Sequence, residues 1–201
     1  GATCVHRIER QLLKARRCGR GGFLRASASW SPDIREHEEC LKLVEKNHLD
    51  VNSNIDGLGL SIFMAACLSK KEAVVRRMLQ NGADVNVRSR SGDSPLYLAT
   101  YRKLTTDDCD DTGLLKHLIE LGCGVNEQNE AGLTPLHLCA WKGNPNLISF
   151  LLSHGADPCV RNRQGATPAS LARLQGNKQA EELLQRTEEE WIVHHSASAN
   201  Q

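Results

Sequence analysis

The chain has 201 residues, enough for one elongated domain or a domain with arms, and its formal net charge is only +1. Hydrophobic residues make up 40% of it but aromatic residues only 4%, which suits thin stacked helices with a core of Leu, Val and Ala. No apolar run approaches the roughly 18 residues that span a bilayer, and no secretory signal pattern is present, so we expect an intracellular protein, cytoplasmic or nuclear.

Residues 1–30 form a basic arm with seven Lys and Arg residues and one acidic residue. Val5, Ile8 and Leu12 recur at helical spacing, which predicts a helix with one apolar face. Three roles stay open for this arm: a helix that caps the end of the following array, a contact for nucleic acid or anionic lipid, or a targeting segment.

Residues 31–54 are interpreted as a degenerate first repeat. Ser31, Pro32 and Asp33 provide an N-cap, a first helical residue and an acidic first turn. The helix that follows leaves through Leu49-Asp50-Val51-Asn52, which matches the later phrase Ala83-Asp84-Val85-Asn86.

A repeated phrase dominates residues 55–190. It opens at Gly59, Gly92, Gly132 and Gly165, so the units begin near residues 58, 91, 131 and 164, and the steps between them are 33, 40 and 33 residues. A period of 33 predicts a solenoid of stacked helix pairs, each of which buries its apolar face only against its neighbours.

Each unit has the same local signals. A hydroxyl side chain followed by proline predicts the start of the first helix, as in Thr134-Pro135, and a glycine such as Gly155 lies just past the second helix. The seven additional residues of the 40-residue step fall between the two helices of the third unit. The last helix, predicted over 178–190, becomes increasingly charged, as a terminal cap should, and residues 191–201 are predicted to be a disordered tail.

The phrases Thr134-Pro-Leu-His-Leu and Gly82-Ala-Asp-Val-Asn resemble the ankyrin repeat family. The resemblance implies an all-α solenoid of four to five repeats, in which helix-turn-helix units are joined by β-hairpin fingers. It also implies that partners bind in a concave groove lined by the fingers and the first helices, and that His137 stiffens its helix start through a hydrogen bond to the Thr134 hydroxyl.

Nothing in the sequence predicts an enzyme, a metal site or a cofactor site. The eight cysteines contain no C-x-x-C pair and are interpreted as small buried thiols, and the acidic loop around 104–111 lacks the ligand spacing of a calcium loop. No nucleophile elbow or glycine-rich phosphate loop is present.

The candidate partner-binding residues lie at two places in each unit. Near the ends of the four first helices, we expect a solvent-facing row of Leu68, Tyr101, Trp141 and Leu174, flanked by the basic residues Arg102 and Lys142. On the fingers we expect a polar rim of Arg90, Asp93, Leu133 and Arg163.

These residues predict a non-enzymatic scaffold or adaptor that binds a peptide or protein with an apolar anchor and acidic character. Two alternatives remain: a nucleic-acid or anionic-membrane binder that uses the basic arm, or a substrate-recognition subunit of a ubiquitin ligase. The second normally needs a recruiting module such as a SOCS box, for which 190–201 is too short. The family resemblance further implies that Asn86 and Asn126, which end Val-Asn phrases, are candidates for asparaginyl hydroxylation.

Overall fold

A computed structural model describes residues 50–52, 59–68, 72–105 and 112–198, with side chains up to residue 193. The chain divides into two compact units, residues 1–90 and 91–201, which are described separately. The basic arm, most of the degenerate first repeat and residues 106–111 of the acidic insertion lie outside the described residues.

In the first unit, helix α4 (Ile62–Cys67) packs against helix α5 (Glu72–Gln80). No proline begins α4, but the Ser61 hydroxyl accepts a hydrogen bond from the Met64 backbone N–H at 3.1 Å. This N-cap satisfies one of the free amides at the helix start. The repeat that opens near residue 58 therefore begins its first helix with a hydroxyl N-cap, as the later repeats do, although it lacks their proline.

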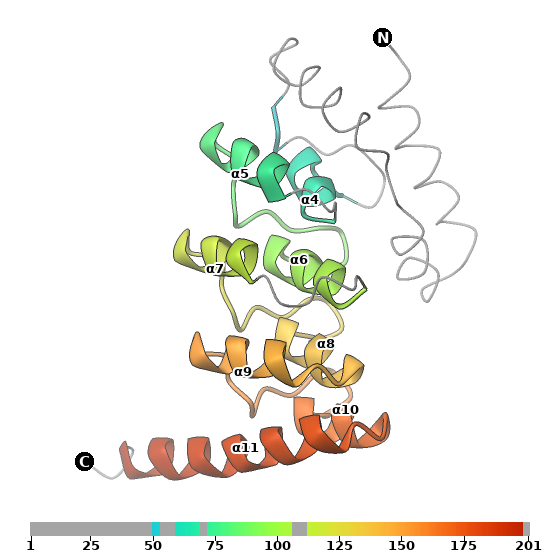
Figure 1. Ribbon diagram of the computed structural model, residues 1–201, viewed down its shortest axis with the longest axis vertical. Helices are drawn as coiled ribbons and strands as arrows, with labels where there is room; N and C mark the ends of the chain where they lie inside the picture. The colour runs from blue at the N-terminus through green and yellow to red at the C-terminus, as the bar shows by residue number, and fades with distance from the viewer. Residues whose placement is uncertain (1–49, 53–58, 69–71, 106–111, 199–201) are drawn as a thin grey trace. The chain divides into compact units, whose positions relative to one another are not determined.

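The second unit holds three repeats. Its helices are α6 (Pro95–Leu104), α7 (Gly113–Glu120), α8 (Pro135–Lys142), α9 (Pro145–Ser153), α10 (Pro168–Leu174) and α11 (Lys178–Ser198). The first helices α6, α8 and α10 stack in one column, α7 and α9 lie in a second column, and α11 runs beneath both (Figure 1). The chain has the all-α fold of a repeat solenoid.

Hydroxyl caps followed by proline begin all three first helices of this unit. Ser94, Thr134 and Thr167 each have extended backbone angles and accept a hydrogen bond from the amide three residues later. Proline then occupies the first helical position, where its missing N–H costs nothing. These starts were predicted from the sequence and are confirmed.

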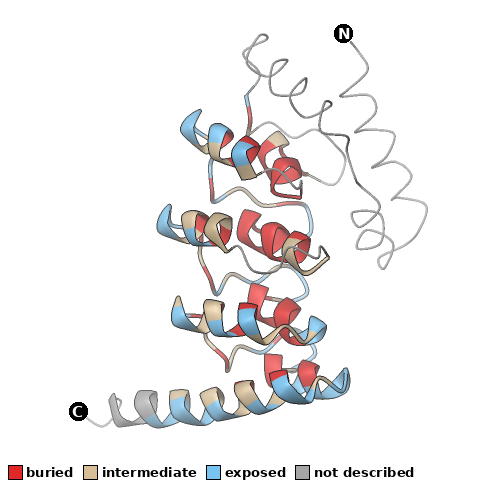
Figure 2. Cartoon of the chain, in the orientation of Figure 1, coloured by how far each residue is buried: buried red, intermediate tan, exposed pale blue. Residues whose placement is uncertain are grey.

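The core of the second unit lies between the two columns. Leu118 of α7 and Leu147, Ile148 and Leu151 of α9 are completely buried. Figure 2 shows buried residues along α6, α8 and α10, whereas α11 is buried only along part of its length. Apolar residues at helical spacing therefore supply the contacts between neighbouring repeats.

The fingers are turns rather than strands, since the described residues contain no β-strand. In the last finger, the Asn162 amide donates to the Ala166 carbonyl at 3.0 Å. The Arg163 amide donates to the Ala131 carbonyl of the preceding finger, also at 3.0 Å. Backbone hydrogen bonds thus close the finger and join it to its neighbour without a regular ladder.

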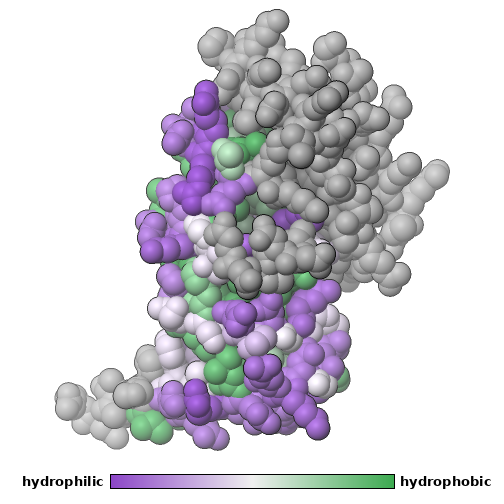
Figure 3. Space-filling view, viewed as in Figure 1, coloured by the Kyte–Doolittle hydropathy of each residue, from purple (hydrophilic) through white to green (hydrophobic). Residues whose placement is uncertain are grey.

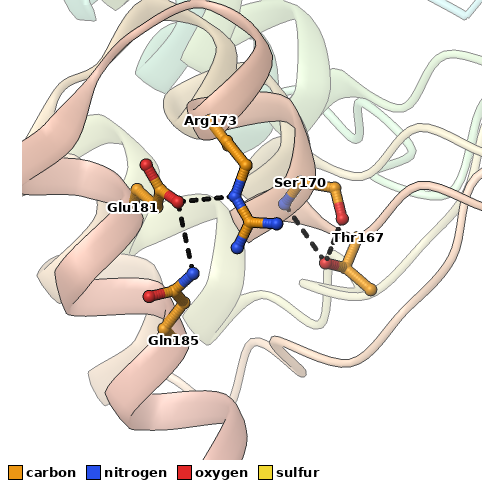
Figure 4. A network of polar contacts seen from close by, with 5 residues as sticks. All are labelled: Thr167, Ser170, Arg173, Glu181 and Gln185. Atoms are coloured by element: carbon orange, nitrogen blue, oxygen red, sulfur yellow. Dashed lines mark hydrogen bonds and ion pairs between the residues drawn. The ribbon is translucent and has the colours of Figure 1, made fainter.

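Polar residues end the stack. At the positions where α8 carries the buried His137 and Ala140, α10 carries the exposed Ser170 and Arg173. The Arg173 Nε atom lies 2.6 Å from a Glu181 carboxylate oxygen of α11, which also accepts a hydrogen bond from Gln185 (Figure 4). The last repeat therefore covers its outer end with solvated side chains, as a capping repeat must.

Helix α11 continues to Ser198, so the prediction of a disordered tail is wrong for 191–198. The helix persists because Ala180, Leu184 and Trp191 follow one another on one face; the first two are buried and Trp191 is half-buried. None of the helices in the described part of the chain is long and apolar enough to cross a membrane.

Candidate functional site

Large apolar side chains are exposed at few places in the described residues. They are Leu121, Trp141, Leu174, Ile192 and Val193, with exposed fractions of 46%, 42%, 71%, 58% and 66%. On the face shown in Figure 3, the second unit is mostly hydrophilic with small apolar areas, one of them at the far end of α11. Exposed apolar residues mark a surface only where they gather.

Trp141 and Leu174 form such a pair. They lie 33 residues apart, hold the same position in successive repeats, and come from α8 and α10, which pack directly against each other. Because packed helices lie about 8–10 Å apart, equivalent side chains on them are neighbours. We call Trp141 and Leu174 the apolar pair.

Both residues are exposed because their helices end there. Helix α8 ends at Lys142, with Gly143 in the left-handed conformation (φ 70°), and α10 ends at Leu174 itself. The last turn of each helix therefore projects its side chains beyond the packed part of the stack. The exposure of Trp141 agrees with the expectation from the sequence.

The predicted row does not continue through Leu68 and Tyr101. Tyr101 is only 7% exposed and Arg102 only 8%, and both lie inside α6, which continues to Leu104. Leu68, in the first unit, is 4% exposed and belongs to the core beside Cys67. The prediction that these three residues face solvent is wrong.

Asp93 is not part of an exposed rim either. It is 5% exposed, and its carboxylate accepts a hydrogen bond from the Asn129 side chain of the next finger at 2.8 Å. Together with burial, the larger cause, this carboxylate raises the pKa of Tyr97. A buried carboxylate needs such partners, so the sequence position predicted as a contact residue is an internal link between fingers.

Of the four other predicted contact residues, three are exposed and one is half-buried. Lys142 follows Trp141 directly and is exposed, and Arg163 is exposed on the last finger. Leu133, on the finger before it, is half-buried. Arg90 is exposed in the first unit. The second unit thus brings together Trp141, Lys142 and Leu174 at the ends of two stacked helices, with Arg163 on the finger side.

Asn177, in the loop between α10 and α11, carries no signal in the sequence that predicts its role. Its side-chain amide donates to the carbonyl of Trp141 at 3.0 Å and to that of Ala140 at 3.2 Å. At the equivalent position one repeat earlier, Asn144 instead caps its own helix by accepting from the Leu147 amide. Asn144 and Asn177 therefore hold the same repeat position but have different partners: Asn144 caps its own helix, and Asn177 binds the end of the preceding first helix.

His137 has a structural role, as the resemblance implied. Its Nδ1 atom lies 2.9 Å from the Thr134 hydroxyl and accepts from the Thr134 amide at 3.2 Å. Its Nε2 atom lies 3.2 Å from the Ala166 carbonyl of the next finger, so Nε2 carries the proton and donates. Burial lowers the pKa of His137, and the neutral ring joins two repeats.

The asparagines proposed for hydroxylation differ in their surroundings. Asn126 is exposed at its turn, but its side chain bridges to the next repeat: it donates to the Gly155 carbonyl at 2.9 Å and accepts from the Asp157 amide at 2.7 Å. Asn86 is also exposed, and its backbone amide donates to the Asp84 carboxylate. Hydroxylation of either residue stays a prediction.

Three of the four described cysteines are buried, and Cys159 is half-buried. Cys67, Cys123 and Cys139 are buried, and burial raises the pKa of Cys139 far above its usual range, so its thiol stays protonated. Within the described ranges, no group of three or more His, Cys, Asp or Glu residues could hold a metal ion.

Two family models match the chain. One, described as ankyrin repeats (many copies), covers residues 62–103, and the other, described as ankyrin repeats (3 copies), covers residues 106–192. The second match spans the apolar pair and both helices that carry it.

Curated relatives match part of the chain. The Arabidopsis thaliana protein named putative E3 ubiquitin-protein ligase XBAT35 is 39% identical over 51% of this chain and 21% of its own length. The human 2-5A-dependent ribonuclease is 41% identical over 34% of this chain and 9% of its own length. Mouse ankyrin repeat and SOCS box protein 5 is 29% identical over 64% of this chain and 39% of its own length. The chain thus spans well under half of each of these relatives.

Proposed function

Because this chain belongs to the ankyrin repeat family, we propose that it is a non-enzymatic scaffold or adaptor that binds a peptide or protein segment through a surface centred on Trp141 and Leu174. The observation that carries the proposal is the apolar pair itself. Two large side chains from adjacent repeats are exposed side by side, although neither is needed to fill the core. Aromatic residues in such positions supply much of the binding energy of protein interfaces.

The partner segment would insert an apolar side chain against the pair and place acidic residues beside it. Lys142 and Arg163 are exposed, and no hydrogen bond or ion pair of the described residues engages either side-chain charge. A carboxylate of the partner could therefore pair with these charges without displacing a carboxylate of the protein itself.

Trp141→Ala tests the proposal. Loss of a central aromatic anchor costs about 2 kcal/mol or more, roughly a 30-fold loss of affinity, while the chain should still fold because Trp141 is exposed and is not one of the buried core residues. The matched control is Leu121→Ala, which removes an equally exposed apolar side chain at the end of α7.

Proteins recovered from cells by the wild type and by Leu121→Ala, but not by Trp141→Ala, are the expected result. The proposal fails if all three chains recover the same proteins in the same amounts. It also fails if Trp141→Ala unfolds, since Trp141 would then be a core residue.

A second candidate function is substrate recognition within a ubiquitin ligase. It is favoured by two relatives whose names contain an E3 ubiquitin-protein ligase and a SOCS box, although the matches cover 21% and 39% of those proteins. In that case, partners lost with Trp141→Ala should accumulate when the protein is depleted from cells. Unchanged half-lives of those partners would exclude the ubiquitin-ligase role, and only the scaffold function would remain.

A further inference from the structure

Lys178, the first residue of α11, is exposed and follows Asn177 directly. Because the Asn177 side chain donates to the Trp141 and Ala140 carbonyls, the start of α11 is tied to the last turn of α8. The backbone of Lys178 therefore lies beside the residue that carries the exposed indole, although the two are 37 positions apart in the sequence.

This junction depends on a glycine. Gly143 has a positive φ of 70°, and a Cβ atom at this position would lie 2.5 Å from Cγ of Asn177. Only a residue without a side chain lets the Asn177 amide approach so closely. The placement of Lys178 next to the end of α8 is thus a built feature of these two repeats.

The charges at this junction are unbalanced. Three other exposed cations, all on helices of the second unit, have acidic partners: Lys116 pairs with Glu120, Arg173 with Glu181 and Arg186 with Glu190. Within the described residues, the ammonium groups of Lys142 and Lys178 have neither a hydrogen bond nor an ion pair. Two uncompensated positive charges therefore border the apolar pair where α8 and α10 end.

We propose that Lys142 and Lys178 together bind a carboxylate of the partner, so that the surface recognises an acidic peptide segment with one large apolar residue. This inference rests on the proposed function. It adds Lys178 to the contact residues and places the acidic part of the partner at the ends of the first helices, not at the finger tips. Leu174 is aliphatic, which suits an apolar side chain better than a stack of bases.

The test uses the 201-residue chain and a phage-displayed library of random 12-residue peptides, selected on the wild type and counter-selected on Trp141→Ala. The selected peptides should carry Asp or Glu within two or three residues of a Leu, Ile, Phe or Trp. Lys142→Glu and Lys178→Glu should each weaken binding of a synthetic selected peptide about three- to tenfold, and changing its acidic residues to Gln should have a similar effect.

One matched variant serves as the control. Lys116→Glu changes the same charge on α7 and should alter binding by less than about twofold. Arg163→Glu, on the finger side of the surface, should weaken binding less than either lysine variant. Fluorescence anisotropy of the labelled peptide measures each dissociation constant, with circular dichroism to confirm that every variant is folded.

The outcomes separate the two proposals. If no peptide depends on Trp141, the proposed function fails. If Trp141-dependent peptides are found but lack acidic residues, or respond more to Arg163→Glu than to Lys178→Glu, the proposed function stands and the carboxylate site is wrong. A labelled oligothymidine that binds as tightly as the selected peptide and loses affinity with Lys142→Glu would also overturn the acidic peptide as the ligand.

Discussion

The opening glycines of the repeats predict a measurable difference between Gly132 and Gly165. Both hold the same phrase position and nearly the same positive φ, 76° and 78°. A Cβ atom on Gly132 would lie 2.7 Å from the backbone nitrogen of Arg163 in the next finger, whereas a Cβ atom on Gly165 would meet nothing within 4 Å. The two residues therefore share the backbone requirement but differ in whether another finger follows closely.

The magnitudes follow from this difference. In Gly165→Ala, the left-handed conformation costs about 1–2 kcal/mol, partly offset by about 0.4–1 kcal/mol from the less flexible unfolded chain, so the net loss is about 1 kcal/mol. Gly132→Ala has the same cost and must also push the next finger away. Overpacking adds about 1–3 kcal/mol, and loss of the hydrogen bond from Arg163 to Ala131 adds about 1 kcal/mol.

We therefore expect Gly132→Ala to lower the free energy of unfolding by about 3–5 kcal/mol and Gly165→Ala by about 1 kcal/mol. Urea denaturation followed by circular dichroism at 222 nm measures both values. Equal losses in the two variants would show that the close approach of the fingers contributes nothing, and that the repeated glycine is needed for its backbone conformation alone.

Further predictions concern the core and pH. Leu151→Ala, at a completely buried position, should lower the free energy of unfolding by about 2–5 kcal/mol, whereas Leu121→Ala, at 46% exposure, should lower it by less than about 1 kcal/mol in the same urea titration. Burial lowers the pKa of His137, so the unfolded chain binds the proton more tightly than the folded chain does. The contribution of the neutral His137 to the free energy of unfolding should therefore be fully present above about pH 6.5 and decrease as the pH falls below that value. Replacing His137 with Gln should reduce this dependence, and an unchanged slope between pH 7.5 and 5.5 would contradict the assignment. Cys139 should not react with iodoacetamide in the folded protein at pH 8 but should react in urea, as mass spectrometry of the modified peptide can show.

Local signals in the sequence predicted the fold because each has a short-range physical cause. A hydroxyl side chain before a proline can satisfy the free amides of a helix start without any tertiary contact, and Ser94, Thr134 and Thr167 all do so. Glycine just past a helix end adopts the left-handed conformation for equally local reasons, as Gly122 and Gly155 do. Repetition of these signals every 33 residues was sufficient to predict the stack.

Exposure within the stack could not be predicted in the same way. Repeat register places Tyr101 and Trp141 at one equivalent position, but α6 continues three residues past Tyr101 and α8 only one past Trp141. Asp93 lies in a stretch of sequence that is typical of a surface turn. Its carboxylate is an internal acceptor because Asn129 of the next finger donates to it. Both outcomes depend on contacts between repeats, which a single repeat's sequence does not contain.

The same dependence on neighbours explains why the proposed surface lies at the ends of the first helices. In α8, Trp141 follows two residues, Cys139 and Ala140, that are completely buried between repeats. In α8, the exposed residues are those of its last turn, Trp141 and Lys142, so the proposed surface uses them. The junction that brings Lys178 to Trp141 exists because Gly143 and Asn177, from different repeats, fit one another. Gly143→Ala should therefore displace the start of α11, and we expect it to weaken a Trp141-dependent peptide even though neither Trp141 nor either lysine has changed. If that peptide binds Gly143→Ala as tightly as the wild type, the position of Lys178 does not depend on this junction.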